Sequence, residues 1–369
     1  MNSIDFAFWI INVILFSLCQ YALEGAMNLM QFTKLIIYNL AILLGLLFLA
    51  EVGFRISEPD YAYYERTCAA DFYEKAWQKL DTNWVQKDTT LGWVCRQKDY
   101  LKFYQPDFFN VAYAINSDGF RSPEFTIPMD TFPRAKRVLL LGDSFLFGIF
   151  LENDQTISAK IQQQLGADFE VFNLSIPGWG LDQMFQAYSK YVQQIQPDIV
   201  LLFYIDDDIS RLVEAFYWGA GVKNAYSLEK GELILRDPED GQLNDLESFF
   251  CFNSQIVNRL YKVGVFQKAL PLSKAILQEM IESEKASGRS LITVRFPRRE
   301  QIGNERLKKY DLEVFFKEHH CTYQDLEKEI RLLPKEAYDP FFIKQDDHPS
   351  ESGTDFISKK LVDMIEKAS

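Results

Sequence analysis

The strongest constraint on the fold is an alternation, from residue 137 onward, between short apolar runs and stretches with helical spacing. The apolar runs are expected strands at 137–142, 169–173, 198–204, 290–296 and 321–326. The expected helices cover 154–165, 181–195, 271–286, 304–318 and 351–367. Runs that are apolar throughout are typical of parallel strands covered on both faces. Residues 136–369 are therefore predicted to form an α/β domain, with a parallel sheet of about five strands between two helical layers.

Two parts of the chain depart from this alternation. Residues 210–268 form a long insertion with an expected hairpin at 226–236, which turns at Lys230 and Gly231. Residues 56–135 are rich in aromatic residues and proline, and we expect an arm or cap there. The aromatic residues of this arm either line a groove for a carbohydrate or acyl group or form the underside of a cap packed on the sheet. We favour the second interpretation.

The N-terminal region, residues 1–55, is predicted to be membrane-associated. Only four charged residues occur in 1–54, and two apolar runs cover 6–23 and 35–54. Each run is close to the roughly 20 apolar residues that a membrane helix needs. A cleaved signal peptide is disfavoured, because no basic segment precedes the first run and no good cleavage site follows the second. We therefore expect an uncleaved anchor in the second run.

The number of membrane helices decides the topology. With one anchor, Lys34 stays cytoplasmic and the rest of the chain is exported; with two helices, the rest lies on the same side as Met1. The prediction is a membrane-anchored protein whose soluble domain lies on the exported, periplasmic or extracytoplasmic side.

Charge and cysteine usage exclude several classes of function. The net charge of −13 argues against a nucleic-acid partner, because phosphate binding needs a basic surface. The five cysteines show no CxxC and no Cys/His ligand spacing, so a zinc site is not expected, and no cofactor is predicted. Four of them follow the membrane region and form either disulfides after export or, as we favour, free thiols: Cys68, Cys95, Cys251 and Cys321.

In parallel sheets the reactive groups gather at the carboxyl ends of the strands, and three such places are distinctive. The first strand ends in Gly-Asp-Ser-Phe at 142–145, where Ser144 is either exposed at a sharp turn or a helix cap. The second is followed by Pro-Gly-Trp-Gly at 177–180, either a plain β-turn or a source of backbone N–H donors. The third is followed by Asp206–Asp208, which we interpret as a solvated loop or a divalent-cation ligand.

Histidine is scarce, which restricts the candidates for a general base. Of the three histidines, His319 and His320 end a charged helix and are expected at the surface. His348 instead follows Asp346 and Asp347 in the loop before the last helix. A serine nucleophile needs a histidine base, and the histidine needs an orienting carboxylate, so His348 is the favoured partner of Ser144.

These motifs occur together in the order of a known family. Gly-Asp-Ser-Phe at 142–145, Asn173 with Gly178, the acidic group after the third strand, and Asp346-x-His348 resemble the SGNH (GDSL-type) hydrolases over residues 116–369. Asn-Ser-Asp-Gly-Phe-Arg at 116–121 and Leu-Gly-Trp at 91–93 resemble the segment that precedes this domain in membrane-anchored bacterial members. The resemblance implies a flavodoxin-like three-layer fold.

The resemblance also implies roles for individual residues. Ser144 would be the nucleophile, with its own N–H in the oxyanion hole, and Gly178 would give a second N–H donor. His348 would be the general base and Asp346 would orient its ring; Asp143 and Asp347 are further candidates, with Asp347 expected to point the other way. The implied reaction transfers an acyl group from an ester to water or another alcohol. The ester-bearing partner would be a small molecule, a lipid or a glycan, possible targets being envelope polysaccharides.

One position departs from the family pattern. The family has an asparagine after the third strand, whose amide donates to the oxyanion, whereas this chain has Asp207. Losing one such donor costs about 2.7–4 kcal/mol. Either Asp206 and Asp208 raise the pKa of Asp207, so that it is a protonated donor, or the site is weak or inactive. The sequence thus allows two functions: a membrane-tethered serine esterase or O-acyltransferase, and a membrane-tethered binding or assembly factor on the same fold.

Overall fold

The structure is a computed structural model that describes residues 29–57, 85–96, 101–105, 109–125, 135–213, 216–217, 221–236, 254–304, 310–344 and 346–369. The chain divides into two compact units. The first comprises residues 1–68 and 245–261, and the second comprises residues 69–244 and 262–369. The second unit contains the sheet that the sequence predicts.

The sheet is parallel throughout and has five strands in the order β13-β12-β7-β5-β6. The strands are β5 (Lys136–Gly142), β6 (Phe169–Ser175), β7 (Ile199–Tyr204), β12 (Ser290–Arg295) and β13 (Thr322–Asp325). This confirms the predicted fold class. In the sheet, β5 has β6 as its neighbour on one side and β7 on the other, so the chain changes direction across the sheet after β6. The carboxyl ends of β5 and β7 therefore flank the switch point at which such sheets bind ligands.

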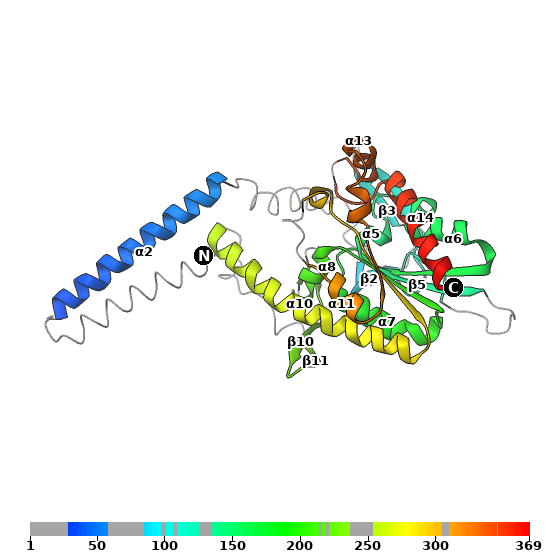
Figure 1. Cartoon of the computed structure of the whole chain (residues 1–369), viewed down its shortest axis with the longest axis horizontal. Coiled ribbons are helices and arrows are strands. Elements are labelled where there is room, and N and C mark those ends of the chain that lie inside the picture. Colours follow the sequence, from blue (N-terminus) through cyan, green and yellow to red (C-terminus); the bar gives the residue numbers. More distant parts are fainter. Residues whose placement is uncertain are drawn as a thin grey trace. The chain divides into compact units, whose positions relative to one another are not determined.

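Helices cover both faces of the sheet (Figure 1). Along β5 the side chains alternate between two cores: Val138 and Leu140 pack in the cluster that includes α6 (Ile157–Leu165) and α14 (Glu351–Ala368). Leu139 and Leu141 pack in the cluster that includes α7 (Leu181–Ile195) and α10 (Gln255–Ala286). Because successive residues of a strand point to opposite faces, an all-apolar strand needs both helical layers.

The helices of the sheet unit differ from the expected ones in two places. The expected helix at 271–286 is the second half of α10, which continues through Pro271. A proline removes one main-chain donor, and the carbonyl that loses it belongs to Gln267, an exposed residue that water can reach. The helix expected at 304–318 is too long: residues 304 and 310–312 are not helical, α11 covers only Glu313–Glu318, and residues 305–309 lie outside the described part.

Short helices occupy several connections where none was expected. The α-helical ones are α5 (Ser144–Phe147), α8 (Asp206–Ser210), α12 (Glu327–Ile330) and α13 (Lys335–Tyr338). Single 3₁₀ turns occur at η2 (Asn153–Gln155), η3 (Gly166–Asp168), η4 (Arg211–Val213), η6 (Arg299–Gln301) and η8 (Asp339–Phe341). Two of these helices, α5 and α8, directly follow β5 and β7, so the residues after those strands are held in regular structure.

The arm before the sheet is more regular than expected. It contains two hairpins, β1 (Val85–Asp88) with β2 (Gly92–Cys95) and β3 (Leu101–Gln105) with β4 (Phe109–Tyr113). Leu91 and Trp93 are fully buried in the core of the sheet unit. The indole N–H of Trp93 donates to Pro177 O over 3.1 Å, and that of Trp179 donates to Trp93 O over 3.0 Å. This part of the arm therefore packs against the turn after β6.

The insertion contains the expected hairpin, as β10 (Ala225–Glu229) and β11 (Glu232–Arg236). Lys230 and Gly231 both have positive φ, of 52° and 91°, as a two-residue hairpin turn of this kind requires. A second, two-residue pair joins β8 (Phe216–Tyr217) and β9 (Gly221–Val222). The end of the insertion belongs to α10, so its last residues are helical.

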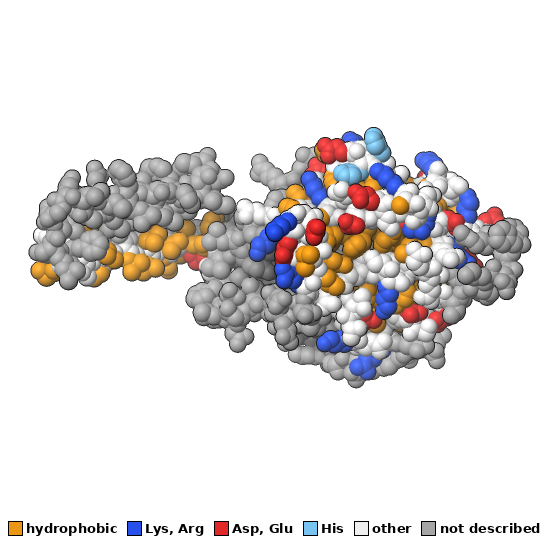
Figure 2. Space-filling view, turned by 90° about the horizontal axis from the view of Figure 1, so that it is seen from below, with side chains coloured by type: hydrophobic (Ala, Val, Ile, Leu, Met, Phe, Trp, Pro, Cys, Tyr) orange, Lys and Arg blue, Asp and Glu red, His pale blue; other side chains and the backbone are white. Residues whose placement is uncertain are grey.

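In the first unit, α2 (Leu29–Ser57) contains one segment, Thr33–Ile56, that is long and apolar enough to cross a membrane. Its mean hydropathy is 2.3 over an 18-residue window, none of which is buried. Hydrophobic side chains cover the side of this helix seen in Figure 2, and Phe48 and Leu49 are 67% and 64% exposed. The other expected membrane helix, at 6–23, lies outside the described residues.

Two of the four cysteines after the membrane region can be placed. Cys95 and Cys321 are free thiols, and burial raises the pKa of each. Cys68 and Cys251 lie outside the described residues. For the described pair, free thiols are therefore the correct alternative.

Candidate active site

Ser144 begins a short helix directly after β5. The helix is capped by Asp143, whose Oδ1 accepts the N–H of Phe145 over 2.9 Å, so the Ser144 hydroxyl is not used for capping. A Cβ at Gly142 would lie 2.7 Å from the Cβ of Leu146 and 3.1 Å from Phe203 O, so only glycine fits this turn. The strand-to-helix turn therefore presents the Ser144 hydroxyl at the carboxyl edge of the sheet.

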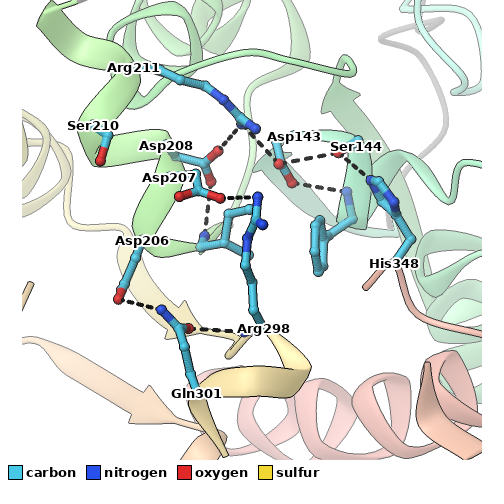
Figure 3. Close-up of polar contacts among 12 residues, drawn as sticks. Asp143, Ser144, Asp206, Asp207, Asp208, Ser210, Arg211, Arg298, Gln301 and His348 are labelled. Atoms are coloured by element: carbon cyan, nitrogen blue, oxygen red, sulfur yellow. Dashed lines mark hydrogen bonds and ion pairs between the residues drawn. The ribbon is translucent and has the colours of Figure 1, made fainter. Parts of the chain in front are cut away.

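The structure brings Ser144, His348 and Asp346 together, and Figure 3 shows the contact between Ser144 and His348. The Oγ of Ser144 and the Nε2 of His348 are 2.7 Å apart. The Nδ1 of His348 bonds the Oδ1 of Asp346, which also accepts the backbone N–H of His348 over 2.7 Å. A serine next to an imidazole that a carboxylate orients is the arrangement in which histidine can take the serine proton.

The electrostatics of this loop favour an ionised Asp346. Burial favours its neutral form, but the charge and hydrogen bonds of His348, together with the charge of Arg298, outweigh it and lower the pKa of Asp346. The pKa of Asp347 is raised, chiefly by burial. The ring of His348 bonds Asp346, and residues 346–348 form a bend rather than the extended segment that was expected.

The turn after β6 lies against the arm and α8. Trp179 N–H donates to Ile176 O over 3.2 Å, and Gly178 has a φ of 82°, which defines a turn with Pro177 and Gly178 at its centre. Among the described residues, neither the Ser144 N–H nor the Gly178 N–H donates a hydrogen bond to another protein group.

The carboxylates of 206–208 are not on a solvated loop, and that interpretation is wrong. Asp206 and Asp208 are 2% and 0% exposed. Each carboxylate pairs with a different arginine: Asp206 with Arg295, Asp207 with Arg298, and Asp208 with Arg211. Within the described residues no group of three or more histidine, cysteine, aspartate or glutamate side chains fits a metal ion. The positive charges beside these carboxylates are therefore three guanidinium groups, where the sequence suggested a divalent cation.

Arg211 links this triplet to the nucleophile. Its Nη1 donates to Asp208 Oδ1 over 2.6 Å, to Asp143 Oδ2 over 3.1 Å and to Trp179 O over 3.1 Å. The pKa of Asp208 is raised well above its ordinary value by burial and by the neighbouring charge of Asp143. The other oxygen contact of Asp143 Oδ2 is the Ser144 hydroxyl, at 3.3 Å. One arginine therefore holds the loops after β5, β6 and β7 together.

Arg298 gives Asp207 a partner that the sequence analysis did not consider. It lies in the loop after β12, where Figure 3 shows it reaching Asp207. The next residue, Arg299, donates to Ile343 O over 2.6 Å and to Asp346 O over 3.2 Å. Asp206 and Asp208 have arginine partners of their own, so each of the three carboxylates is paired with a guanidinium. Arg298 follows the fourth strand closely, so the rule that functional groups gather at strand ends also points to this arginine.

No protein-family model matches the sequence, and no curated protein matches it. In structure, the chain is similar to a lipase/acylhydrolase from Enterococcus faecalis, with 16% identity and a TM-score of 0.38, over 63% of this chain and 96% of that one. It is also similar to a psychrotrophic esterase from Pseudoalteromonas, with 12% identity and a TM-score of 0.37, over 63% and 97%. A carbohydrate acetylesterase family member from Sinorhizobium meliloti gives 11% identity and a TM-score of 0.38, over 63% and 98%.

Proposed function

We propose that the protein is a serine esterase of SGNH type, which hydrolyses or transfers an ester-linked acyl group. The observation that carries the proposal is the 2.7 Å contact between Ser144 Oγ and His348 Nε2, with Asp346 on the other ring nitrogen. These groups stand at the switch point of a parallel sheet, where ligands of such folds bind. The order of motifs in the sequence supports the same reaction.

Acylation would begin at Ser144. His348 removes the hydroxyl proton through Nε2 as Oγ bonds to the ester carbonyl carbon, and the carbonyl oxygen becomes an oxyanion. Collapse of this intermediate breaks the carbon–oxygen bond to the alcohol, which leaves with the proton that His348 carried. Asp346 keeps the imidazole in the required tautomer and stabilises its charge. Water or a second alcohol then releases the acyl group by the same steps in reverse.

The oxyanion would be stabilised by the N–H groups of Ser144 and Gly178. A lone carboxylate at Asp207 would repel it, but the Arg298 guanidinium pairs with that carboxylate and removes the net charge. Fixed donors and charges of this kind supply several kcal/mol of barrier reduction, about 2.7–4 kcal/mol for a single donor. The ion pair therefore supports catalysis despite the missing amide.

The substrate we propose is an ester-bearing small molecule, lipid or glycan that is reached from a membrane. Helix α2 would tether the enzyme, with the sheet unit on the exported side. Alkaline extraction of membranes containing the full chain tests the tether: the protein should remain in the membrane pellet. Release into the supernatant, or a mature N-terminus that begins after α2, would contradict it.

A second function, binding without catalysis, is favoured by one observation, the carboxylate at Asp207 in place of an amide. Labelling with a fluorophosphonate probe separates the two functions, because the probe reacts with an activated serine. We expect labelling that Ser144→Ala abolishes and that Ser358→Ala, a buried serine on α14, leaves intact. A folded protein that is not labelled at any pH from about 4 to 9 would favour the binding function.

A further inference from the structure

Arg121, outside the triad, is buried against the loop that follows the nucleophile helix. It is 6% exposed and donates four hydrogen bonds to this loop. Its Nη1 donates to Phe147 O over 3.2 Å and to Gly148 O over 2.8 Å, and its Nη2 donates to Leu151 O over 2.7 Å. Its Nε donates to Asn153 Oδ1 over 2.9 Å. A planar guanidinium is suited to hold several carbonyls at fixed spacing, which a lysine ammonium cannot do.

Phe150, inside that loop, has an unusual backbone conformation. Its φ is 69°, in a region that residues other than glycine rarely adopt, and the residue is 3% exposed. Its N–H donates to Tyr113 Oη over 2.9 Å, and the guanidinium carbon of Arg121 lies 4.4 Å from the centre of the Tyr113 ring. Such a conformation persists where the surroundings impose it. Here the surroundings include Tyr113 and Arg121, both from the segment that precedes the sheet.

The ring of Phe150 contacts His348. Their ring centres are 5.9 Å apart at an interplanar angle of 89°, and the ring of Phe145 lies 4.6 Å from the same imidazole. The two phenylalanines leave the imidazole little freedom to rotate away from Ser144. The position of Phe150, and with it the orientation of His348, depends on the backbone of the loop that Arg121 holds.

We propose that Arg121 is a positioning residue for His348 and acts through Phe150. The proposal rests on the proposed esterase function. Arg121 makes no contact with Ser144 or His348, and its donors are directed to the loop 147–153, so its effect on the reaction is geometric. Because a displacement of about 1 Å at a reacting group costs on the order of a hundredfold in rate, a loosened loop would be seen in kcat.

The test is a double-mutant cycle in the full-length protein, with turnover of a small activated ester as the assay. Arg121→Lys keeps the charge but not the four hydrogen bonds, and Phe150→Leu removes the ring. Each should lower kcat about 10- to 100-fold with little change in KM. In the Phe150→Leu background, Arg121→Lys should cost less than about threefold, because its route to His348 is already broken. Phe125→Leu, another buried phenylalanine with no contact to His348, controls for lost packing and should keep kcat.

The proposal would be overturned if the losses in kcat of the two single variants multiply in the double variant. It would also be overturned by a normal kcat in Arg121→Lys or by an effect on KM alone. A second measurement separates it from the proposed function. With only three histidines, carbon-13 labelling of histidine gives few ring signals, and the signal lost in His348→Gln identifies His348. In Arg121→Lys this signal should broaden or split, while it should be unchanged in Phe125→Leu. An unperturbed signal would overturn the positioning role, whereas a wild-type protein that fails to turn over esters would overturn only the function.

Discussion

Two carboxylates at the same edge of the sheet, Asp346 and Asp207, have different partners and different consequences. Asp346 bonds to the imidazole of His348, a ring that can accept a proton at one nitrogen while it donates one from the other. Asp207 pairs with the guanidinium of Arg298, which keeps its proton at all ordinary pH values. The first pair can therefore take part in proton transfer, while the second can only fix charge and geometry. The partner, and not the residue type, decides what a buried carboxylate does.

The largest effect should come from breaking the first pair. Asp346→Asn removes the charge and allows the wrong imidazole tautomer, so kcat should fall by about 10³- to 10⁴-fold with the fold intact. Ester turnover and the rate of fluorophosphonate labelling measure this, with circular dichroism as the control for folding. Asp347→Asn is the matched substitution, and it should change kcat by less than about tenfold. Equal losses in both variants would show that the two carboxylates are not distinguished.

The second effect comes from breaking the other pair. Arg298→Met removes the guanidinium that pairs with the carboxylate of Asp207, and kcat/KM should fall about a hundredfold because that negative charge lies near the proposed oxyanion. Adding Asp207→Asn to this variant removes the charge and supplies an amide, so the double variant should regain most of the loss. Steady-state kinetics on the four proteins measure the coupling. If the double variant is as slow as the single one, the charge of Asp207 does not limit the reaction.

A smaller effect, of opposite sign, is expected for Asp207→Asn alone. The amide restores a neutral donor, but it also releases Arg298, so esterase activity should rise by no more than about tenfold. The comparison of kcat with the wild type at one substrate and pH measures it. An unchanged or lower kcat would mean that the carboxylate serves the site better than the amide.

The smallest effect concerns stability against pH. Because the pKa of Asp346 is lower in the folded protein, its ionised form stabilises the fold above the unfolded pKa of about 3.9. That contribution is lost as the pH falls through the folded value. Denaturant unfolding between about pH 3 and 6 should show this loss in the wild type and a weaker slope in Asp346→Asn. Identical slopes would contradict the lowered pKa.

The fold could be predicted in outline because it depends on local pattern. The all-apolar runs that became β5 and β7 require cover on both faces, and the apolar spacing of α14 supplies part of that cover. The same reasoning failed at Pro271, where the cost of one lost hydrogen bond depends on whether water reaches the unbonded carbonyl. The types of the main elements of the sheet domain followed from the sequence, but the ends of the elements and the short helices between them depended on the surroundings.

The sequence by itself determined the α/β class and which residue types stand at the carboxyl ends of the strands, since both follow from the order of residues along the chain. Ser144 was found from its position after the first strand, and His348 because histidine is rare in this sequence. Only the tertiary structure decided the partners of the charged residues. Arg298 and Asp207 are far apart in the sequence, as are Phe150 and His348, and no local pattern records which side chains meet. The attraction between two charged groups is strong only at short distance. These groups come close only when the strands and loops are assembled.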